Sequence, residues 1–329
     1  MMKPYVFITR KLSKEAIKPL EAVAEVHMWP EDEVAVPREV LMEEAKKADG
    51  ILTMLSDKID KELIDNAPNL KVIANLAVGF DNIDVEYATE KGIAVCNTPD
   101  VLTDTTADLT FALLLATARR IVEAAEFVKE GNWKSWSPLL LAGHDVHHKT
   151  LGIVGMGKIG EAVAKRALGF DMEVLYHNRS RKIETEEKLG VVYTSFEDLL
   201  EASDFIICLT PLTEQTKNLF TAESFTKMKK SAVFINVSRG PVVDETALYE
   251  ALVNGEIAAA GLDVFVKEPI EKSHPLVTLP NVVALPHIGS SSTETRTIMM
   301  QLCANNIKLV LESQEPETLV NKEWLLCKN

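Results

Sequence analysis

The stretch from Thr150 to Lys182 constrains this chain most, because it reads as strand, glycine turn, helix and second strand. The apolar, partly β-branched run Leu151 to Val154 is typical of a buried parallel strand. In the turn that follows, the first glycine permits a tight bend, the second lets the backbone approach a pyrophosphate, and the third lets helix and strand pack closely. The start of the helix attracts phosphate through its free N–H groups and its dipole. The stretch predicts a dinucleotide site at Gly155, Met156, Gly157, Lys158, Ile159 and Gly160.

Composition excludes several classes of function. A chain of 329 residues with 47% hydrophobic residues is long enough for two domains with ordinary cores. The formal net charge of −14 would repel nucleic-acid phosphates and anionic membranes. No segment is apolar for long enough to span a bilayer, and the N-terminal apolar run is too short for a signal peptide. We expect a soluble protein that binds neither nucleic acid nor membrane.

Cysteine and histidine spacing gives no sign of a metal site. The four cysteines, Cys96, Cys208, Cys303 and Cys327, lie far apart with no CxxC pattern, as in reduced cytoplasmic proteins. The segment 144–148 holds three histidines and an aspartate, but it lies in a loop and lacks the helical register of a ligand set. We therefore expect a cytoplasmic protein without a bound metal.

The order of apolar and amphipathic runs predicts an α/β fold. Short apolar runs alternate with helical patterns through the first hundred residues and again after residue 150, which predicts parallel sheets covered on both faces. Between them, Asp104 to Lys129 reads as one long helix that could connect two lobes. A second long helical pattern, Ser291 to Ser313, could cross back to the first lobe. The nucleotide domain is thus expected to be an insertion between the two chain ends.

Three segments after the glycine turn each end a strand with a chemically useful residue: Arg239, Glu268 and His287. Open α/β sheets bind their ligands at the carboxyl ends of strands. A histidine can carry a proton, a glutamate can hold and polarise its imidazole, and an arginine can bind a carboxylate or carbonyl oxygen. Each residue alone has an ordinary structural explanation, but their joint placement predicts an acid catalyst.

The chain resembles the D-isomer-specific 2-hydroxyacid dehydrogenases along nearly its whole length, and most of all the glyoxylate/hydroxypyruvate reductase branch. The matching segments, in the family's order, are LAVGFDNID, GIAVCNTP, TADLTFALLLATARR, GIVGMGKIG, SDFIICLTPLTEQT, FINVSRGPVVDE, AAAGLDVF, EP and PHIGS. The resemblance implies two doubly wound parallel-sheet α/β domains. A Rossmann-type NADP(H)-binding domain, residues 102–289, would be inserted into a flavodoxin-like substrate-binding domain, residues 1–101 and 290–329. It also implies a homodimer paired through the nucleotide domain.

The same resemblance implies a reaction, the reduction of a small 2-oxo acid such as glyoxylate or hydroxypyruvate by hydride transfer from a nicotinamide. His287 would protonate the carbonyl oxygen, and Glu268 would keep that proton available near neutral pH. Arg239 would polarise the carbonyl and bind the carboxylate.

The resemblance also assigns binding residues around this catalytic set. Backbone N–H groups of Val78 and Gly79 would receive the carboxylate's other oxygen, and Leu55 or Ser56 would line the same pocket. Asp263 would orient the nicotinamide carboxamide. Further cofactor contacts are expected at Thr106, Leu209, Thr210, Pro211, Thr216, Val237, Ser238 and Gly289.

The end of the second strand departs from the pattern of NAD-preferring relatives. They place Asp or Glu there to accept the ribose hydroxyls, whereas this chain has Asn178 followed by Arg179, Ser180 and Arg181. A carboxylate would repel a 2′-phosphate, while asparagine does not, and the flanking arginine and serine can bind it. The sequence predicts that NADP(H) is preferred, with NAD(H) possible.

Two alternatives stay open, and one is disfavoured. A 2-ketogluconate (sugar-acid) reductase shares every motif above and differs only in its pocket residues. A nucleotide-sensing corepressor-like scaffold is an alternative of another class, which turnover would exclude. A formate dehydrogenase is disfavoured, because that branch has a glutamine where this chain has Glu268.

Overall fold

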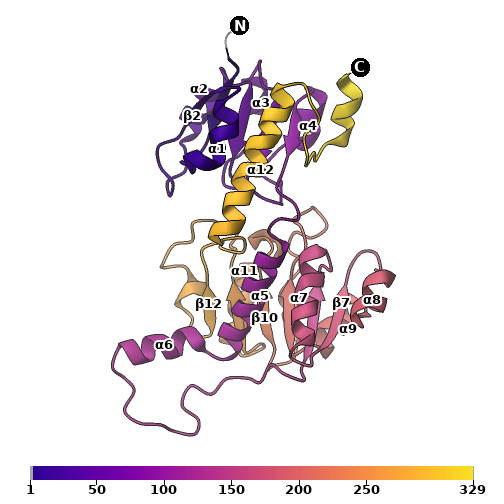
Figure 1. Cartoon of the computed structure of the whole chain (residues 1–329). Coiled ribbons are helices and arrows are strands. Elements are labelled where there is room, and N and C mark those ends of the chain that lie inside the picture. Colours follow the sequence, from indigo (N-terminus) through magenta and orange to yellow (C-terminus); the bar gives the residue numbers. More distant parts are fainter. Residues whose placement is uncertain (1–2, 329) are drawn as a thin grey trace. The chain divides into compact units, whose positions relative to one another are not determined.

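The computed structural model describes residues 3–328 and divides the chain into two compact units (Figure 1). The first unit comprises Met1–Leu102 and Ser292–Asn329, and the second comprises Thr103–Ser291. The chain leaves the first unit once and returns to it once, so both chain ends belong to the same unit.

The first unit is built on a five-stranded parallel sheet with the order β2-β1-β3-β4-β5. Residues alternate between its two faces. Phe7, Ile51 and Ile73 pack in one core with side chains of α2, α3 and α4. Helices α1 and α12 pack against each other, and α12 contacts β3 and β4 (Figure 1). The elements are β1 (Tyr5–Ile8), α1 (Lys14–Glu21), β2 (Glu25–Met28), α2 (Arg38–Ala45), β3 (Gly50–Thr53), α3 (Lys61–Asp65), β4 (Val72–Asn75), α4 (Val85–Glu90), β5 (Ala94–Cys96), α12 (Thr293–Leu311) and the 3₁₀ helix η3 (Lys322–Lys328).

The second unit is built on a seven-stranded parallel sheet with the order β12-β11-β10-β9-β6-β7-β8. The strand order reverses between β6 and β9, the kind of switch point at which such sheets bind ligands. Its elements are α5 (Thr103–Ala118), α6 (Ile121–Lys129), β6 (Thr150–Val154), α7 (Lys158–Leu168), β7 (Glu173–His177), α8 (Ile183–Leu189), β8 (Val192–Tyr193), α9 (Phe196–Ala202), β9 (Phe205–Cys208), α10 (Ala222–Lys227), β10 (Val233–Asn236), η1 (Gly240–Val242), α11 (Glu245–Val253), β11 (Ala259–Leu262), η2 (Pro275–Thr278) and β12 (Val282–Ala284).

Neighbouring residues of the central strands divide between two cores. Ile153, Ile207 and Ile235 pack with residues of α5 and α7, whereas Ile206 and Phe234 pack with residues of α9, α10 and α11. Burial on both faces explains why these strands are continuously apolar in sequence. The predicted fold class, two doubly wound parallel-sheet α/β units, is confirmed.

The prediction of one long helix over residues 104–129 is wrong, because the structure has two helices, α5 and α6. Arg120 lies between them with φ of 52°, in the left-handed region that ends a helix. The carbonyl of Ala118, which a continuous helix would use internally, accepts a hydrogen bond from the N–H of His144 (2.8 Å). The returning loop therefore replaces the next turn of α5. Among residues 3–328, no helix combines the length and apolar character needed to cross a bilayer.

Candidate active site

The glycine turn between β6 and α7 leaves room for a phosphate group. Gly155 has φ of 107°, and a Cβ there would lie 2.7 Å from the carbonyl carbon of Leu209. A Cβ on Gly160 would lie 2.7 Å from the carbonyl oxygen of Gly155, so helix and turn approach closely. At Gly157, by contrast, a Cβ would meet nothing within 4 Å. Because α7 also begins without a side-chain cap, the turn fits a dinucleotide pyrophosphate.

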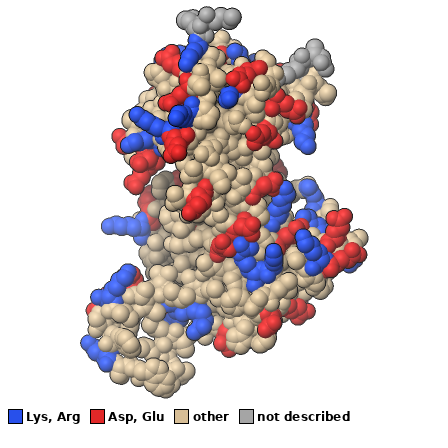
Figure 2. Space-filling view, in the orientation of Figure 1, with Lys and Arg blue, Asp and Glu red and all other residues tan. Residues whose placement is uncertain are grey.

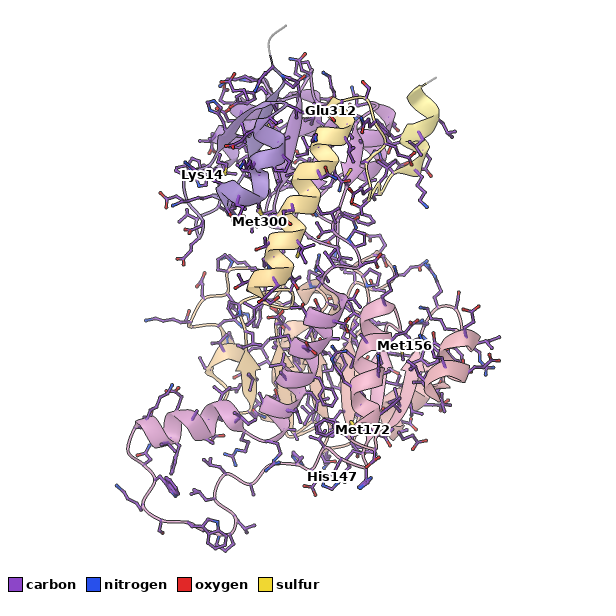
Figure 3. All side chains as sticks on the ribbon, viewed as in Figure 1. Lys14, His147, Met156, Met172, Met300 and Glu312 are labelled. Atoms are coloured by element: carbon purple, nitrogen blue, oxygen red, sulfur yellow. The ribbon has the colours of Figure 1, made fainter. Side chains whose placement is uncertain are left out.

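Asn178 is bound to the glycine turn through both ends of its amide. Its Oδ1 accepts from the N–H of Met156 (2.7 Å), and its Nδ2 donates to the carbonyl of Met156 (3.2 Å). Met156, labelled in Figure 3, has a fully buried side chain, so only its backbone is available at the turn. An aspartate at position 178 could accept the first of these bonds but not donate the second.

The basic residues after β7 are not equivalent. The Arg181 guanidinium forms a two-pronged contact with the Glu186 carboxylate, with a shortest distance of 2.7 Å. Hydrogen bonds from Arg181 and Tyr176 lower the pKa of Glu186 from 4.5 to about 2. Within residues 3–328, Arg179 makes no hydrogen bond or ion pair, and it is exposed. Figure 2 shows basic and acidic side chains interspersed over the surface near α7 and α8. Arg179 is therefore the arginine available to a ligand.

The structure brings His287 and Glu268 together. His287 Nδ1 lies 2.7 Å from Glu268 Oε2, and the other carboxylate oxygen accepts from the N–H of Phe265 (2.9 Å). Burial opposes ionisation of Glu268, but the hydrogen bond and charge of His287, the Phe265 amide and the charge of Arg239 outweigh it and lower its pKa. A charged glutamate thus fixes one ring nitrogen of the histidine and leaves Nε2 for a substrate. His287 has φ of 54°, an uncommon backbone conformation that often marks functional positions.

Arg239 and Gly240 follow β10, at the same end of the sheet. The Arg239 guanidinium donates to the carbonyl of Ser238 (2.9 Å), and its positive charge helps to lower the pKa of Glu268. A Cβ on Gly240 would lie within 2.2 Å of the backbone of Phe265 and Val266. Because Gly240 has no side chain, the backbone of Phe265 and Val266, which leads to Glu268, packs directly against the backbone that follows Arg239.

Four of the predicted cofactor residues meet around Gly289. Asp263 is 1% exposed and accepts hydrogen bonds from the N–H groups of Ile288 and Gly289, both at 2.8 Å. Burial raises the pKa of Asp263, although those two amides and the charge of His287 act in the opposite direction. A Cβ on Gly289 would lie 3.3 Å from Asp263 Oδ2, 3.4 Å from Thr106 Cγ2 and 3.5 Å from Val237 Cγ1. This cluster joins the His287 segment to the end of β11.

The hydroxyl groups after β9 and β10 already have partners inside the protein. Ser238 Oγ donates to Asn236 Oδ1 (2.8 Å), and Cys208 Sγ lies 3.2 Å from Ser238 Oγ and 3.6 Å from Thr210 Oγ1. Thr216 Oγ1 donates to the carbonyl of Pro211 (2.6 Å). At Leu209, the backbone packs against Gly155. Leu209 and Thr210 thus line the glycine turn on the β9 side.

The predicted substrate residues other than Arg239 and His287 lie in the first unit, in loops that follow β3 and β4. Ser56 Oγ accepts from Arg10 Nη2 (3.0 Å), at the switch point between β1 and β3. The carbonyl of Val78 accepts from Asn97 Nδ2, and the carbonyl of Gly79 accepts from Asn75 Nδ2, both at 2.8 Å. Roles for Arg10, Asn75 and Asn97 were not predicted from the sequence. An available signal was that Asn75 and Asn97 are polar residues at the ends of buried apolar strands.

The histidine-rich loop before β6 is exposed. His147, labelled in Figure 3, lies 3.9 Å from Asp145, and His148 lies 4.0 Å from Asp171. Within the described residues, no group of three or more histidine, cysteine, aspartate or glutamate side chains is arranged to hold a metal ion.

Comparisons with known proteins give one consistent result. The profile described as "D-isomer specific 2-hydroxyacid dehydrogenase, NAD binding domain" matches residues 111–289. The glyoxylate reductase of Pyrococcus horikoshii is 51% identical over 326 residues, which are 98% of this chain and 97% of the relative.

Two solved structures are similar over nearly the whole chain and contain different cofactors. One is the NADPH-dependent glyoxylate/hydroxypyruvate reductase of Sinorhizobium meliloti in complex with NADP and malonate, with a TM-score of 0.84, 34% identity and 98% coverage of both chains. The other is the D-lactate dehydrogenase of Aquifex aeolicus complexed with NAD and lactic acid, with a TM-score of 0.85 and 29% identity, covering 96% of this chain and 98% of that one.

Proposed function

The chain belongs to the D-isomer-specific 2-hydroxyacid dehydrogenase family, and we propose that it is an NADPH-dependent reductase of glyoxylate and hydroxypyruvate. At the level of the family it is an oxidoreductase that acts on CH–OH donors. The observation that carries the proposal is the 2.7 Å contact between His287 and Glu268 in a chain that is 51% identical to a glyoxylate reductase. We assign the substrate to the unit made from both chain ends, and NADP(H) to the inserted unit.

In the proposed reaction, the His287 imidazolium donates the proton from Nε2 to the substrate's carbonyl oxygen. Bound NADPH supplies the hydride that reduces C2, so a 2-oxo acid becomes a D-2-hydroxy acid. Glu268 holds Nδ1 and, because it is charged, stabilises the imidazolium before the proton leaves. Positioned acid catalysis of this kind contributes about 10²- to 10⁴-fold in rate.

The substrate carboxylate needs donors, and the chain offers two kinds. Arg239 provides a planar guanidinium, which matches a carboxylate with two parallel hydrogen bonds. Val78 and Gly79 provide backbone N–H groups, and we propose that they receive the second carboxylate oxygen. Leu55 and Ser56 follow β3 in the same unit and are proposed to limit the size of the substrate side chain.

The preference for NADPH is supported by the residues that follow β7. Arg179 and Ser180 are exposed, and we propose that they bind the 2′-phosphate. Asn178 replaces the acid that would repel this phosphate, and Arg181 supports the loop through Glu186. The remaining proposed contacts are the glycine turn for the pyrophosphate and Asp263, with Thr106 and Gly289 beside it, for the nicotinamide carboxamide. One solved relative contains NADP and another contains NAD, so membership of the family does not determine which cofactor is preferred. The proposed preference for NADPH therefore rests on the residues of this chain.

Homodimer formation is proposed from the exposed apolar surface of the arm, which we define as residues 119–145. None of the residues of α6 is buried, and the loop after it has Trp136 at 78% and Leu139 at 81% exposure. Figure 1 shows α6 and this loop projecting from the sheet of their own unit, and Figure 2 shows the loop mainly without charge. Several large apolar side chains left exposed in one segment are typical of a protein–protein interface.

A cytoplasmic location is also part of the proposal. Cys96, Cys208 and Cys303 are buried and unpaired, as is usual for proteins of reducing compartments. Labelling of the denatured protein with a thiol reagent, before and after reduction, measures whether any disulfide forms.

A panel of 2-oxo acids assayed with both reduced cofactors tests the proposed function. Glyoxylate and hydroxypyruvate are expected to give the highest kcat/KM, with NADPH favoured over NADH by about tenfold or more, the effect of one charge-assisted hydrogen bond. If kcat/KM is higher for 2-ketogluconate than for glyoxylate and hydroxypyruvate, the protein is a sugar-acid reductase instead. A ratio of kcat/KM with NADPH to kcat/KM with NADH at or below unity would reject the preference for NADPH. If no acid is turned over, the remaining candidate is a nucleotide-binding scaffold.

A further inference from the structure

Two successive N–H groups in the loop after β4 have no partner within the protein. Among residues 3–328, neither the N–H of Val78 nor that of Gly79 donates a hydrogen bond, although their neighbours Leu76 and Ala77 donate to Thr53 and Asn75. Successive N–H groups that point to the same side of the chain form a concave donor site that suits a carboxylate oxygen.

The direction of these N–H groups is set by the carbonyls on the other side of the same peptide planes. In a trans peptide the C=O of one residue and the N–H of the next point in opposite directions. The carbonyl of Ala77 accepts from the N–H of Thr98 (2.9 Å), and the carbonyl of Val78 accepts from Asn97 Nδ2 (2.8 Å). The segment after β5 therefore holds both carbonyls and turns both N–H groups away from itself.

A second asparagine holds the next peptide and connects it to the other substrate loop. Asn75 Nδ2 donates to the carbonyl of Gly79 (2.8 Å) and to Asn82 Oδ1 (3.0 Å). Asn82 Nδ2 donates to the carbonyls of Met54 (3.1 Å) and Asp57 (3.0 Å). Those two carbonyls bracket Leu55 and Ser56, the residues proposed to limit substrate size.

Burial makes these hydrogen bonds costly to lose. The exposed fractions are 0% for Asn75 and 9% for Asn97. Inside a protein a hydrogen bond is electrostatically stronger than in water, and a buried carbonyl that loses its donor cannot recover the bond from solvent. The side-chain amides of these asparagines therefore hold the loops after β3 and β4 in one arrangement.

We propose that Asn75, Asn82 and Asn97 form an asparagine brace, a set of positioning residues that aims the N–H groups of Val78 and Gly79 at the substrate carboxylate. The brace also fixes the spacing between this donor pair and the loop of Leu55 and Ser56. This inference rests on the proposed function, because it assigns the carboxylate of the proposed 2-oxo acid substrate to the first unit.

Asn97→Asp tests the brace most directly. The replacement keeps the shape of the side chain, removes the donor to the Val78 carbonyl and places a carboxylate against it. The KM for glyoxylate is expected to rise about tenfold or more, as for the loss of a buried hydrogen bond, while kcat changes much less. The Kd for NADPH, measured by fluorescence in the absence of substrate, should stay within about twofold, because the nucleotide residues lie in the other unit.

Asn321→Asp is the matched control for general damage to the same unit. Asn321 is 2% exposed, and its side chain forms hydrogen bonds with Thr89, Ile93 and Val95, which lie outside both substrate loops. It should lower the melting temperature without changing the KM for glyoxylate. If both variants raise KM equally, the effect of Asn97→Asp is general destabilisation and the brace is rejected.

Hydrogen exchange separates failure of the brace from failure of the proposed function. The backbone amides of residues 76–83 should exchange faster in Asn97→Asp than in wild type and Asn321→Asp, whether or not the wild type reduces any 2-oxo acid. Unchanged exchange, or an unchanged KM in an active protein, would overturn the brace. If Asn97→Asp does not fold, Asn82→Ala gives the same two readouts, because Asn82 is only half-buried and its removal frees the carbonyls of Met54 and Asp57.

Discussion

At the scale of the residue, similar side chains in one short segment have different surroundings. Arg179 and Arg181 are separated by a single serine, and both are exposed. Arg181 is held by Glu186, whereas Arg179 has no partner among the described residues. An arginine without a carboxylate partner keeps its full capacity to bind a phosphate. The two residues therefore provide a matched test of cofactor preference.

Replacing Arg179 with Ala should raise the KM for NADPH by about ten- to a hundredfold, the effect of losing a charge-assisted hydrogen bond, and leave the KM for NADH nearly unchanged. Arg181→Ala, which removes the same charge two residues away, should have a much smaller effect on both. Steady-state kinetics with the two cofactors measures the difference. Equal effects of the two substitutions would show that net charge, and not the position of Arg179, determines the preference.

The surroundings of a single residue could be predicted from the sequence where that residue is part of a short motif. Gly155, Gly157 and Gly160 have the space and conformation that their spacing predicts, because the strand, turn and helix that place them are consecutive in the chain. The partners of Asn178 and Asn97 could not be predicted in this way, because they lie 22 and 19 residues away. Such contacts depend on how strands align in the sheet, which the sequence pattern does not specify.

At the scale of the element, the strand, turn and helix from β6 to α7 together form the site that we propose for the pyrophosphate of the cofactor. Two glycines of the turn have opposite surroundings. A Cβ at Gly157 would enter open space, and a Cβ at Gly160 would collide with the carbonyl of Gly155. Gly160 therefore allows the close packing of helix on strand, whereas Gly157 leaves the space that we propose for the pyrophosphate.

Gly157→Ala should leave the melting temperature nearly unchanged and weaken NADPH binding by about tenfold or more, because the new methyl group occupies the space of the pyrophosphate. Gly160→Ala should instead lower the free energy of unfolding by about 1 to 3 kcal/mol, as overpacking does. Thermal melts and NADPH titrations of both variants measure this. The interpretation fails if Gly157→Ala destabilises the protein as much as Gly160→Ala does.

Two elements that the sequence predicts, the strand Leu151 to Val154 and the helix Ser291 to Ser313, end within two residues of β6 and α12 in the structure. The exception is the region of α5 and α6. The sequence from 104 to 129 contains no glycine or proline that would mark a break. The helix ends because the N–H of His144 takes the Ala118 carbonyl, a contact across 26 residues. Local propensity cannot reveal such competition.

At the scale of the whole molecule, the arm carries several large apolar side chains that remain exposed to solvent. Trp133, Trp136 and Leu139 are each more than half exposed. Trp136→Ser combined with Leu139→Ser should shift a dimer towards monomer, because burial of such side chains contributes about 1.5 to 3 kcal/mol each. Sedimentation velocity at several protein concentrations measures the shift. Ile183→Ser is the control, since it removes an exposed apolar side chain outside the arm. An unchanged dimer, or a monomeric wild type, would exclude the arm as the interface.

The most direct test of the account is the reduction of glyoxylate by His287→Gln, measured with saturating NADPH alongside the affinity for that cofactor. Glutamine can still bond Glu268 but cannot carry the proton. The account predicts that kcat falls by about 10²-fold or more, as for the loss of a general acid, while the Kd for NADPH stays within about twofold. A variant that binds NADPH normally and retains a kcat close to that of the wild type would contradict it.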